Sequence, residues 1–194
     1  MRLGILGGTF NPIHTGHLLL AECAREQCAL DRVLFVPAAT PPHKAAPDLL
    51  DGRQRLALIR LAIRGHAAFQ ASDVELKLGG VSYTVRTLQA LHARHPAAKL
   101  FFLVGSDMLR VPWHRWDDVK RLCTFIVADR RSHPSRALKS GQFGKVQWLT
   151  MPQIEIASST IRARIRQRRS IRYLVPDAVA RYIATHRLFQ RGRA

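Results

Sequence analysis

The sequence predicts an α/β fold: a doubly wound, Rossmann-like parallel sheet with helices on both faces. Two observations carry this prediction. Segments with apolar residues at helical spacing separate most of the short apolar runs that are typical of buried strands, which lie at 2–6, 32–37, 99–105, 123–128 and 146–149. A strand, a helix and a second strand form a parallel pair with a right-handed crossover, and a series of such units builds this fold.

Length and composition restrict the class of protein. With 194 residues, 47% of them hydrophobic, the chain can bury a core, so we expect a single domain over 1–194. No apolar run reaches the length of a membrane span, and the first residues lack the pattern of a signal peptide, so we expect a cytoplasmic protein without a membrane partner. The three cysteines have no metal-binding spacing and are interpreted as buried free thiols.

The charge of the chain indicates anionic ligands. A formal net charge of +18 attracts nucleotides, nucleic acids or acidic surfaces. A nucleic-acid-binding protein would interleave basic residues with exposed aromatics or carry a recognised motif. Aromatic residues make up only 7% of the chain and we find no such motif, so a nucleic-acid partner is the weaker interpretation.

The first strand leads into a glycine-bearing turn and a helix. The apolar run at 2–6 ends at Gly7, and apolar residues recur at helical spacing after His17. This order brings backbone N–H groups and the positive end of a helix to one point, which suits a phosphate. The turn matches neither the P-loop nor the three-glycine dinucleotide pattern. Its notable residues are His14 and His17 on either side of Gly16; two ordinary histidines are the alternative, and no third ligand indicates a metal.

The second strand, at 32–37, ends in a proline and is followed by a stiff loop. Thr40-Pro41-Pro42-His43-Lys44 lies in this loop, where the carboxyl edge of an open α/β sheet holds ligands. His43 and Lys44 would then face the site, and a solvated surface loop is the alternative. Asp51 can cap a helix over 51–64.

The middle of the chain is predicted to continue with an extended segment and another helix. Residues 69–78 are expected to be extended, and Gly79-Gly80 turns the chain. The next helix starts within Ser82-Tyr83-Thr84, and either hydroxyl residue can cap it. A plain helix cap and contact with a ligand are equally consistent with these residues.

The apolar strand at 99–105 ends at Gly105-Ser106-Asp107, a second corner that faces a ligand. Asp107 can accept hydrogen bonds from a ribose or adenine, or cap the next helix. Trp113 and Trp116 follow; packing is one use of such residues, and stacking on a flat ring is the other.

A further helix is predicted directly after the last strand. Ser158 or Ser159 is expected to cap it, and Arg162 lies in its first turns. This helix start would form a second anion site, because it combines hydroxyls, unpaired N–H groups and an arginine. The alternative is an ordinary serine cap with an arginine on the surface. The later arginines 164, 166, 168 and 169 are interpreted mostly as a solvated face, and Pro176-Asp177 opens a final helix.

The run Gly7-Gly8-Thr9-Phe10-Asn11-Pro12-Ile13-His14, followed by Thr15-Gly16-His17, resembles the bacterial nicotinate-nucleotide adenylyltransferase family of the nucleotidylyltransferase superfamily. The motifs at 41–44, 105–107 and 158–162 resemble that family's other motifs and come in its order. Trp116 matches the family's tryptophan after a slightly longer gap, and Ala157 stands where a serine is common. The resemblance implies direct transfer of adenylate from ATP to nicotinate mononucleotide, which gives deamido-NAD and pyrophosphate.

The resemblance also implies a role for each matching residue. His14 and His17 would be catalytic. The ATP-binding residues would be these two histidines with Gly7, Gly8, Thr9, Phe10, Gly105, Asp107, Ser158, Ser159 and Arg162. The mononucleotide would contact His43, Lys44, Tyr83, Thr84 and Trp116. Mg²⁺ would arrive with ATP rather than in a metal site of the protein.

Three alternatives to this function stay open at the level of the sequence. A related adenylyltransferase would use nicotinamide mononucleotide or pantetheine phosphate as its acceptor. A cytidylyltransferase would use CTP. A basic nucleic-acid-binding protein would turn over no nucleotide at all. The sequence also leaves a homo-oligomer open.

Overall fold

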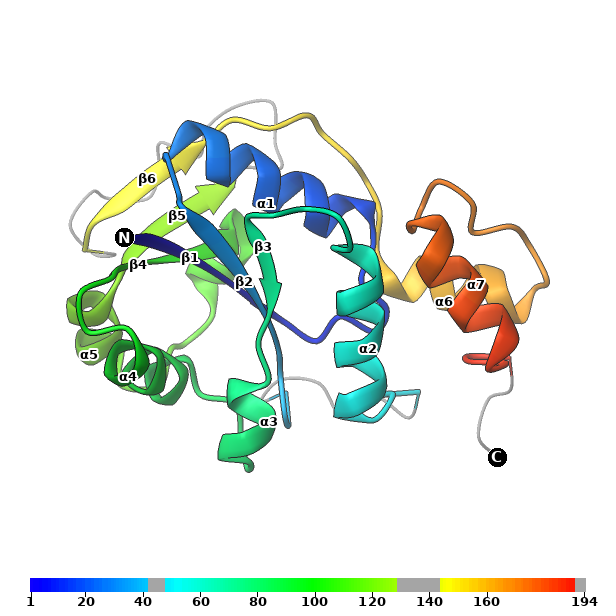
Figure 1. The fold of residues 1–194 in the computed structure, drawn as a ribbon, viewed down its shortest axis with the longest axis horizontal. Helices are drawn as coiled ribbons and strands as arrows, with labels where there is room; N and C mark the ends of the chain where they lie inside the picture. The colour runs from blue at the N-terminus through cyan, green and yellow to red at the C-terminus, as the bar shows by residue number, and fades with distance from the viewer. Residues whose placement is uncertain (42–47, 129–143, 191–194) are drawn as a thin grey trace.

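The computed structural model describes residues 1–41, 48–128 and 144–190. Within them, six strands form one parallel sheet in the order β3-β2-β1-β4-β5-β6 (Figure 1). The strands are β1 (Arg2–Gly8), β2 (Arg32–Pro37), β3 (Phe69–Ala71), β4 (Lys99–Gly105), β5 (Thr124–Ala128) and β6 (Val146–Leu149). The predicted doubly wound parallel sheet is confirmed.

Helices cover both faces of the sheet, as predicted. Four helices pack into the core on one face: α1 (Thr15–Gln27), α2 (Gly52–Ala62), α6 (Ser158–Arg166) and α7 (Asp177–Thr185). The other face is covered by α3 (Val74–Leu78), α4 (Thr84–Arg94) and α5 (Trp116–Leu122). In Figure 1, α6 and α7 lie at one end of the molecule, beyond α2, with which α7 is in contact.

The two cores explain why the strands are apolar along their whole length. In β2, Val33 and Phe35 join one core, whereas Leu34 and Val36 join the other. Successive residues of a strand face opposite sides, so a strand covered on both sides needs apolar residues at every position. The chain leaves β1 through α1 toward β2 on one side, and β4 pairs with β1 on the other side. Ligands bind at such a switch point in open α/β sheets, beyond the carboxyl ends of the two strands.

Two predictions for the elements between β2 and β4 are wrong. The extended segment over 69–78 consists of β3 and then the short helix α3, because the side chains of Val74 and Glu75 turn into the interior. The cap of α4 is neither Ser82 nor Thr84: Tyr83 holds the N-cap position without a side-chain hydrogen bond, and Ser82 Oγ accepts the N–H of Ala39 at 2.8 Å. The predicted Asp51 cap of α2 is confirmed by its bond to the N–H of Arg53.

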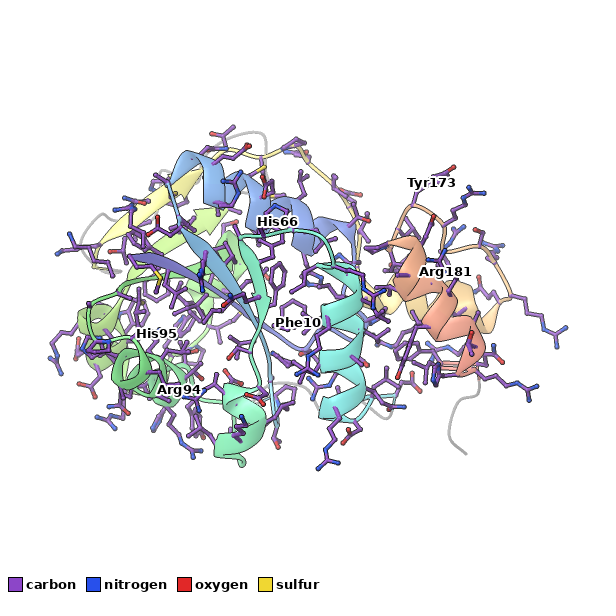
Figure 2. The ribbon with its side chains drawn as sticks, in the orientation of Figure 1. Phe10, His66, Arg94, His95, Tyr173 and Arg181 are labelled. Atoms are coloured by element: carbon purple, nitrogen blue, oxygen red, sulfur yellow. The ribbon has the colours of Figure 1, made fainter. Side chains whose placement is uncertain are left out.

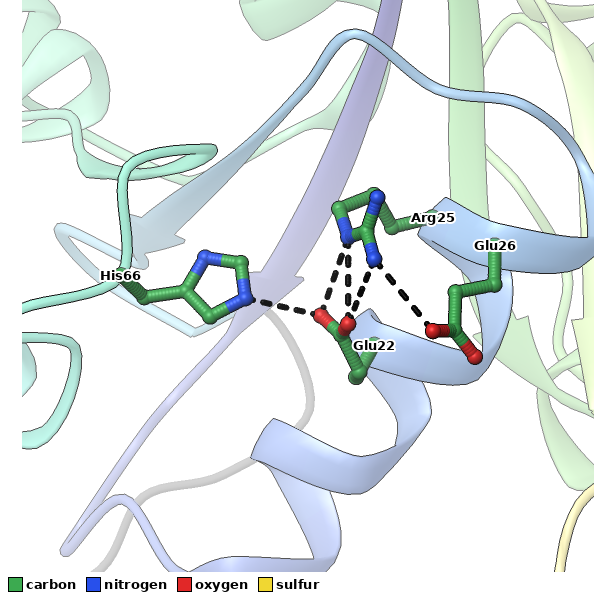
Figure 3. Close-up of polar contacts among 4 residues, drawn as sticks. All are labelled: Glu22, Arg25, Glu26 and His66. Atoms are coloured by element: carbon green, nitrogen blue, oxygen red, sulfur yellow. Dashed lines mark hydrogen bonds and ion pairs between the residues drawn. The ribbon is translucent and has the colours of Figure 1, made fainter.

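A cluster of charged side chains joins α1 to the segment that precedes β3 (Figure 3). Glu22 accepts from Arg25 at 2.7 Å and pairs with His66 Nε2 at 2.9 Å, and Arg25 also reaches Glu26. The hydrogen bond from Arg25 lowers the pKa of Glu22. The His66 ring in turn stacks on Phe69 with centroids 3.7 Å apart. The cluster therefore attaches the edge strand β3 to α1.

The connection between α6 and α7 packs on the start of α1. The Thr15 N–H donates to the carbonyl of Leu174 at 2.9 Å, and its hydroxyl donates to the same carbonyl at 3.0 Å. Tyr173 is 78% exposed, and Figure 2 shows its side chain at the outer edge of the molecule. In the described parts of the chain, no helix has the length and apolar character needed to cross a membrane.

Candidate functional site

The turn after β1 is held by a buried phenylalanine. Phe10 has a φ of 48° and is 2% exposed, and Figure 2 shows it inside the molecule, between the sheet and α2. Its ring lies edge-on to the ring of His17, with centroids 4.9 Å apart. A Cβ atom at Gly8 would approach the Phe10 ring to 3.2 Å, so the glycine makes room for this side chain. Phe10 thus acts as an internal support for the imidazole.

The two histidines stack on each other at the start of α1. His14 and His17 have ring centroids 3.7 Å apart and an interplanar angle of 25°. The His14 backbone N–H donates to His17 Nδ1 at 3.2 Å, so neutral His17 carries its proton on Nε2. At Gly16, a Cβ would lie 3.2 Å from His14 Nδ1. The N–H of neutral His17 therefore lies at Nε2, and the absent side chain of Gly16 permits the stack.

The start of α6 contacts this same turn. Ser158 Oγ donates to the carbonyl of Pro12 at 2.8 Å, and Arg162 Nη1 donates to that of Asn11 at 2.9 Å. The predicted serine cap is wrong: Ala157 is the N-cap of α6, and Ser158 is already its first helical residue, with its hydroxyl bonded to the turn. Two helix starts that are 140 residues or more apart in sequence therefore meet at one place, as the two predicted phosphate sites require.

Arg162 is held by the turn and by an acidic residue. Burial lowers the pKa of Arg162, and the nearby Asp48 carboxylate, 4.0 Å from Nε, acts in the opposite direction. Guanidinium stays protonated under such shifts, so Arg162 brings a positive charge to the site. Arg166 forms an ion pair with the same carboxylate.

Asn11 and Asp48, which were not among the predicted site residues, join the turn to the chain before α2. Asn11 is buried; its Nδ2 donates to the carbonyl of Asp48 at 2.9 Å, and its Oδ1 accepts the N–H of Leu50 at 3.1 Å. The sequence does show the amide side chain of Asn11 in the turn, which would need hydrogen-bond partners if it were buried. Those partners are backbone groups of Asp48 and Leu50, which the sequence alone does not identify.

The carboxyl end of β4 supplies the second corner of the site. Gly105 ends the strand, and Asp107 is exposed on the 3₁₀ helix Ser106–Arg110, in which it forms no cap. Trp113 Nε1 donates to the carbonyl of Met108 at 3.0 Å. Trp116 packs beside Trp113 and Phe125, with its ring centroid 5.2 Å from that of Phe125. Trp116 is thus partly buried against the core on its face of the sheet, and its stacking on a pyridine stays a prediction.

The predicted mononucleotide residues are only partly described. His43 and Lys44 lie outside the described residues. Thr84 is the first residue of α4, and Tyr83 lies just before it with its ring 4.3 Å from that of His114. The N–H of Ser82 donates to the carbonyl of Thr40 at 3.0 Å, so the start of α4 is attached to the segment that follows β2.

The chemistry of this edge suits phosphate oxygens. The imidazole of His17, the hydroxyl of Ser158 and the guanidinium of Arg162 come together there. The end of β4 adds one carboxylate, that of Asp107. Among the residues that the structure describes, no three His, Cys, Asp or Glu side chains gather as metal ligands. A Mg²⁺ ion that is bound mainly by phosphates and water fits this donor set, because it needs few protein ligands.

Comparisons with known proteins agree with this geometry. The cytidylyltransferase-like family matches residues 5–166. A protein of Salinibacter ruber named "Probable nicotinate-nucleotide adenylyltransferase" is 41% identical, and the match covers 98% of each chain; one of Oceanobacillus iheyensis with the same name is 40% identical over 98% of each chain. A Plasmodium falciparum nicotinic acid mononucleotide adenylyltransferase, solved with NaAD, shares the fold with a TM-score of 0.80 at 18% identity over 97% of each chain. The chain belongs to the cytidylyltransferase-like family and, within it, to the nicotinate-nucleotide adenylyltransferases.

Proposed function

We propose that this protein transfers adenylate from ATP to nicotinate mononucleotide, forming deamido-NAD and pyrophosphate in NAD biosynthesis. The observation that carries the proposal is the meeting of the two helix starts, one with His14 and His17 and one with Ser158 and Arg162. Relatives about 40% identical over their full length, which bear the name of this activity, support it.

The reaction proceeds without a covalent enzyme intermediate. A phosphate oxygen of the mononucleotide attacks the α-phosphorus of ATP in line, and the bond from that phosphorus to the α–β bridging oxygen breaks. Both electrons of the broken bond leave with pyrophosphate. Catalysis then consists of alignment and stabilisation of charge, and each described residue of the site serves one of these two tasks.

The two helix starts divide the triphosphate between them. His17 donates from Nε2 to the α-phosphate as its charge develops, and His14 supports this imidazole by stacking on it. Thr9 and the backbone amides of the turn hold the same phosphate, and Gly7 and Gly8 let the chain approach it closely. Ser158, Ser159 and Arg162 hold the leaving pyrophosphate.

The substrates complete the site. Mg²⁺ enters as part of the ATP substrate and, when bound, neutralises charge on the phosphate oxygens. Gly105 and Asp107 face the adenosine, with the Asp107 carboxylate accepting a hydrogen bond. The mononucleotide contacts His43, Lys44, Tyr83, Thr84 and Trp116. We place the protein in the cytoplasm and leave its oligomeric state to measurement.

A pyrophosphate-release assay tests the function. The purified protein is supplied with Mg·ATP and, in separate reactions, nicotinate mononucleotide, nicotinamide mononucleotide or pantetheine phosphate. We expect the highest kcat/KM with the nicotinate acceptor and little pyrophosphate when CTP replaces ATP. A preference for another acceptor or for CTP would reassign the substrate, and no turnover with any of them would refute the proposal.

A pair of arginine variants tests the assignment of the pyrophosphate site. Arg162→Met removes a half-buried guanidinium from the turn, whereas Arg169→Met removes an exposed one just beyond the same helix. We expect kcat/KM for ATP to fall by roughly 10- to 100-fold in the first variant, the loss typical of a charged hydrogen bond, and to stay close to the wild-type value in the second. Equal values in the two variants would contradict the assignment.

A further inference from the structure

A buried arginine lies behind the turn that follows β1. Arg55, in the first turns of α2, is 1% exposed and donates three hydrogen bonds, all to backbone carbonyls. Nε donates to Leu50 at 3.0 Å, Nη1 to Thr9 at 2.9 Å and Nη2 to Ala38 at 2.6 Å. One guanidinium thus joins the turn after β1 and the segment after β2 to Leu50, just before its own helix.

Packing alone does not explain an arginine at this position. Arg55 lies on the same face of α2 as Leu58 and Ile59, which are fully buried in an apolar core. Removing a guanidinium from water is unfavourable, and burial lowers the pKa of Arg55 although the charges of Asp51 and Glu75 oppose this. A well-packed apolar residue serves stability as well or better in such a place. The fork of donors, matched to three carbonyls, is the property that an apolar residue lacks.

The three carbonyls belong to chain segments on both sides of the proposed reaction. Thr9 is in the turn assigned to the α-phosphate. Ala38 begins the segment after β2, in which the N–H of Ala39 donates to Ser82 Oγ and the carbonyl of Thr40 accepts from the Ser82 N–H. Ser82 directly precedes the start of α4, to which the mononucleotide was assigned. A continuous set of hydrogen bonds therefore runs from the phosphate turn, through Arg55, to the start of α4.

A second buried side chain stabilises the α4 end of this set. Glu75 Oε1 accepts the hydroxyl hydrogen of Thr87 at 2.6 Å, and both residues are buried. Burial raises the pKa of Glu75, whereas hydrogen bonds from Ser82 and Thr87 and the charge of Arg55 lower it. Arg55 and Glu75 thus support the two ends of the same short segment.

We propose that Arg55 is a positioning residue for adenylyl transfer, which sets the distance between the two substrate subsites by holding the carbonyls of Thr9 and Ala38 on one guanidinium. This inference rests on the proposed function. Arg55 acts on geometry and not on charge at the reacting atoms, because each of its three guanidinium nitrogens donates to a backbone carbonyl. An error of about 1 Å in the alignment of two reacting groups costs on the order of 100-fold in rate, so a small shift of either carbonyl is sufficient.

The test compares Arg55→Lys and Arg55→Ala with Leu58→Ala, which removes a buried side chain from the same helix without touching either subsite. For each folded variant, kcat is measured by pyrophosphate release and binding of ATP alone by calorimetry. We expect kcat to fall about 100-fold in Arg55→Lys while the Kd for ATP changes by less than about threefold. Guanidinium chloride at a non-denaturing concentration should restore part of the activity of Arg55→Ala. Leu58→Ala should lower the Tm and keep its kcat.

Two results would overturn the inference: a kcat of Arg55→Lys within about threefold of the wild-type value, or a loss in Leu58→Ala as large as that in Arg55→Lys. Where the Arg55 variants fail to fold, Ser82→Ala decides, because it breaks the same set of hydrogen bonds at its half-buried end beside α4. An unchanged kcat in Ser82→Ala overturns the inference, and a fall of roughly tenfold supports it. A wild-type protein that releases no pyrophosphate would instead refute the proposed function.

Discussion

The bond between the His14 backbone and His17 Nδ1 allows the two nitrogens of one imidazole to be tested separately. In His17→Asn, the side-chain oxygen takes the place of Nδ1 and can accept the same N–H, but nothing replaces the Nε2 donor. In His17→Gln, the amide nitrogen comes near the position of Nε2. In His17→Ala, both functions are lost. The three variants therefore separate support of the turn from stabilisation of the phosphate.

Loss of the Nε2 donor and loss of the Nδ1 acceptor of His17 should have effects of different size on kcat and on Tm. Loss of a preorganised donor to developing charge costs about 2.7–4 kcal/mol, or roughly 100- to 1,000-fold in kcat. Loss of the neutral hydrogen bond to Nδ1 costs only about 1 kcal/mol of stability, which lowers the Tm of a chain of this size by about 2–4 °C. We expect His17→Asn to keep its Tm and lose at least about 100-fold in kcat, and His17→Ala to lose both.

Steady-state pyrophosphate release and thermal unfolding measure these effects, with the exposed His92→Asn as the control for a histidine outside the site. We expect His17→Gln to retain more activity than His17→Asn, because its amide can still donate. Turnover of His17→Asn within about threefold of the wild-type value would refute the assignment of the donor to Nε2.

Three further predictions follow from contacts and burial. Gly16→Ala should keep or raise the Tm but reduce kcat about tenfold, because the new Cβ would meet the His14 ring at 3.2 Å; an unchanged kcat would show that the stack is dispensable. Burial raises the pKa of Glu75 in the folded protein. Protonated Glu75 therefore adds stability below the usual carboxyl pKa, and this stability is lost as the pH rises through the raised pKa. Glu75→Gln should flatten this part of a plot of Tm against pH, and parallel plots for the variant and the wild type would contradict the prediction. Burial also raises the pKa of Cys123 to about 12, so a thiol reagent at pH 8 should modify it only after unfolding, while modification of the native protein would disprove this.

The strands were predictable because burial on both faces leaves a plain signal in the sequence. Each apolar run became a strand of the central sheet: three have the predicted bounds, and two differ from them by one or two residues at one end. The short elements were not predictable. A five-residue helix such as Val74–Leu78 is too short to show a helical period, and its buried Glu75 places a charged residue where a buried helix face would be apolar. Its position depends on Thr87, which comes from a later helix.

The site shows the same division between short-range and long-range information. The histidines, the glycine between them and the start of α1 are encoded within eleven consecutive residues, so the sequence identified them together. The partners of Ser158 and Arg162 are carbonyls 146 and 151 residues away in sequence, and the sequence therefore predicted a cap for the serine that the structure assigns to Ala157. Arg55 did leave a signal, since it shares helical spacing with Leu58 and Ile59, and a charge on an apolar face calls for a buried partner.

Donor side chains at this site bind backbone carbonyls of the turn that follows β1. Carbonyls of the turn are held by Arg55 at Thr9, by Arg162 at Asn11 and by Ser158 at Pro12, from two different helices. In a trans peptide the N–H points opposite to its own carbonyl, so a donor that binds the Thr9 carbonyl directs the next N–H away from itself. Arg55 from α2 and Ser158 from α6 thus direct the N–H groups of Phe10 and Ile13 toward the other side of the turn, whereas the Asn11 carbonyl, which Arg162 binds, precedes Pro12 and so has no N–H after it. Part of the arrangement that would receive a phosphate is in this way produced by Arg55, which does not touch the phosphate, and for this reason substitution of Arg55 should affect turnover as strongly as substitution of His17.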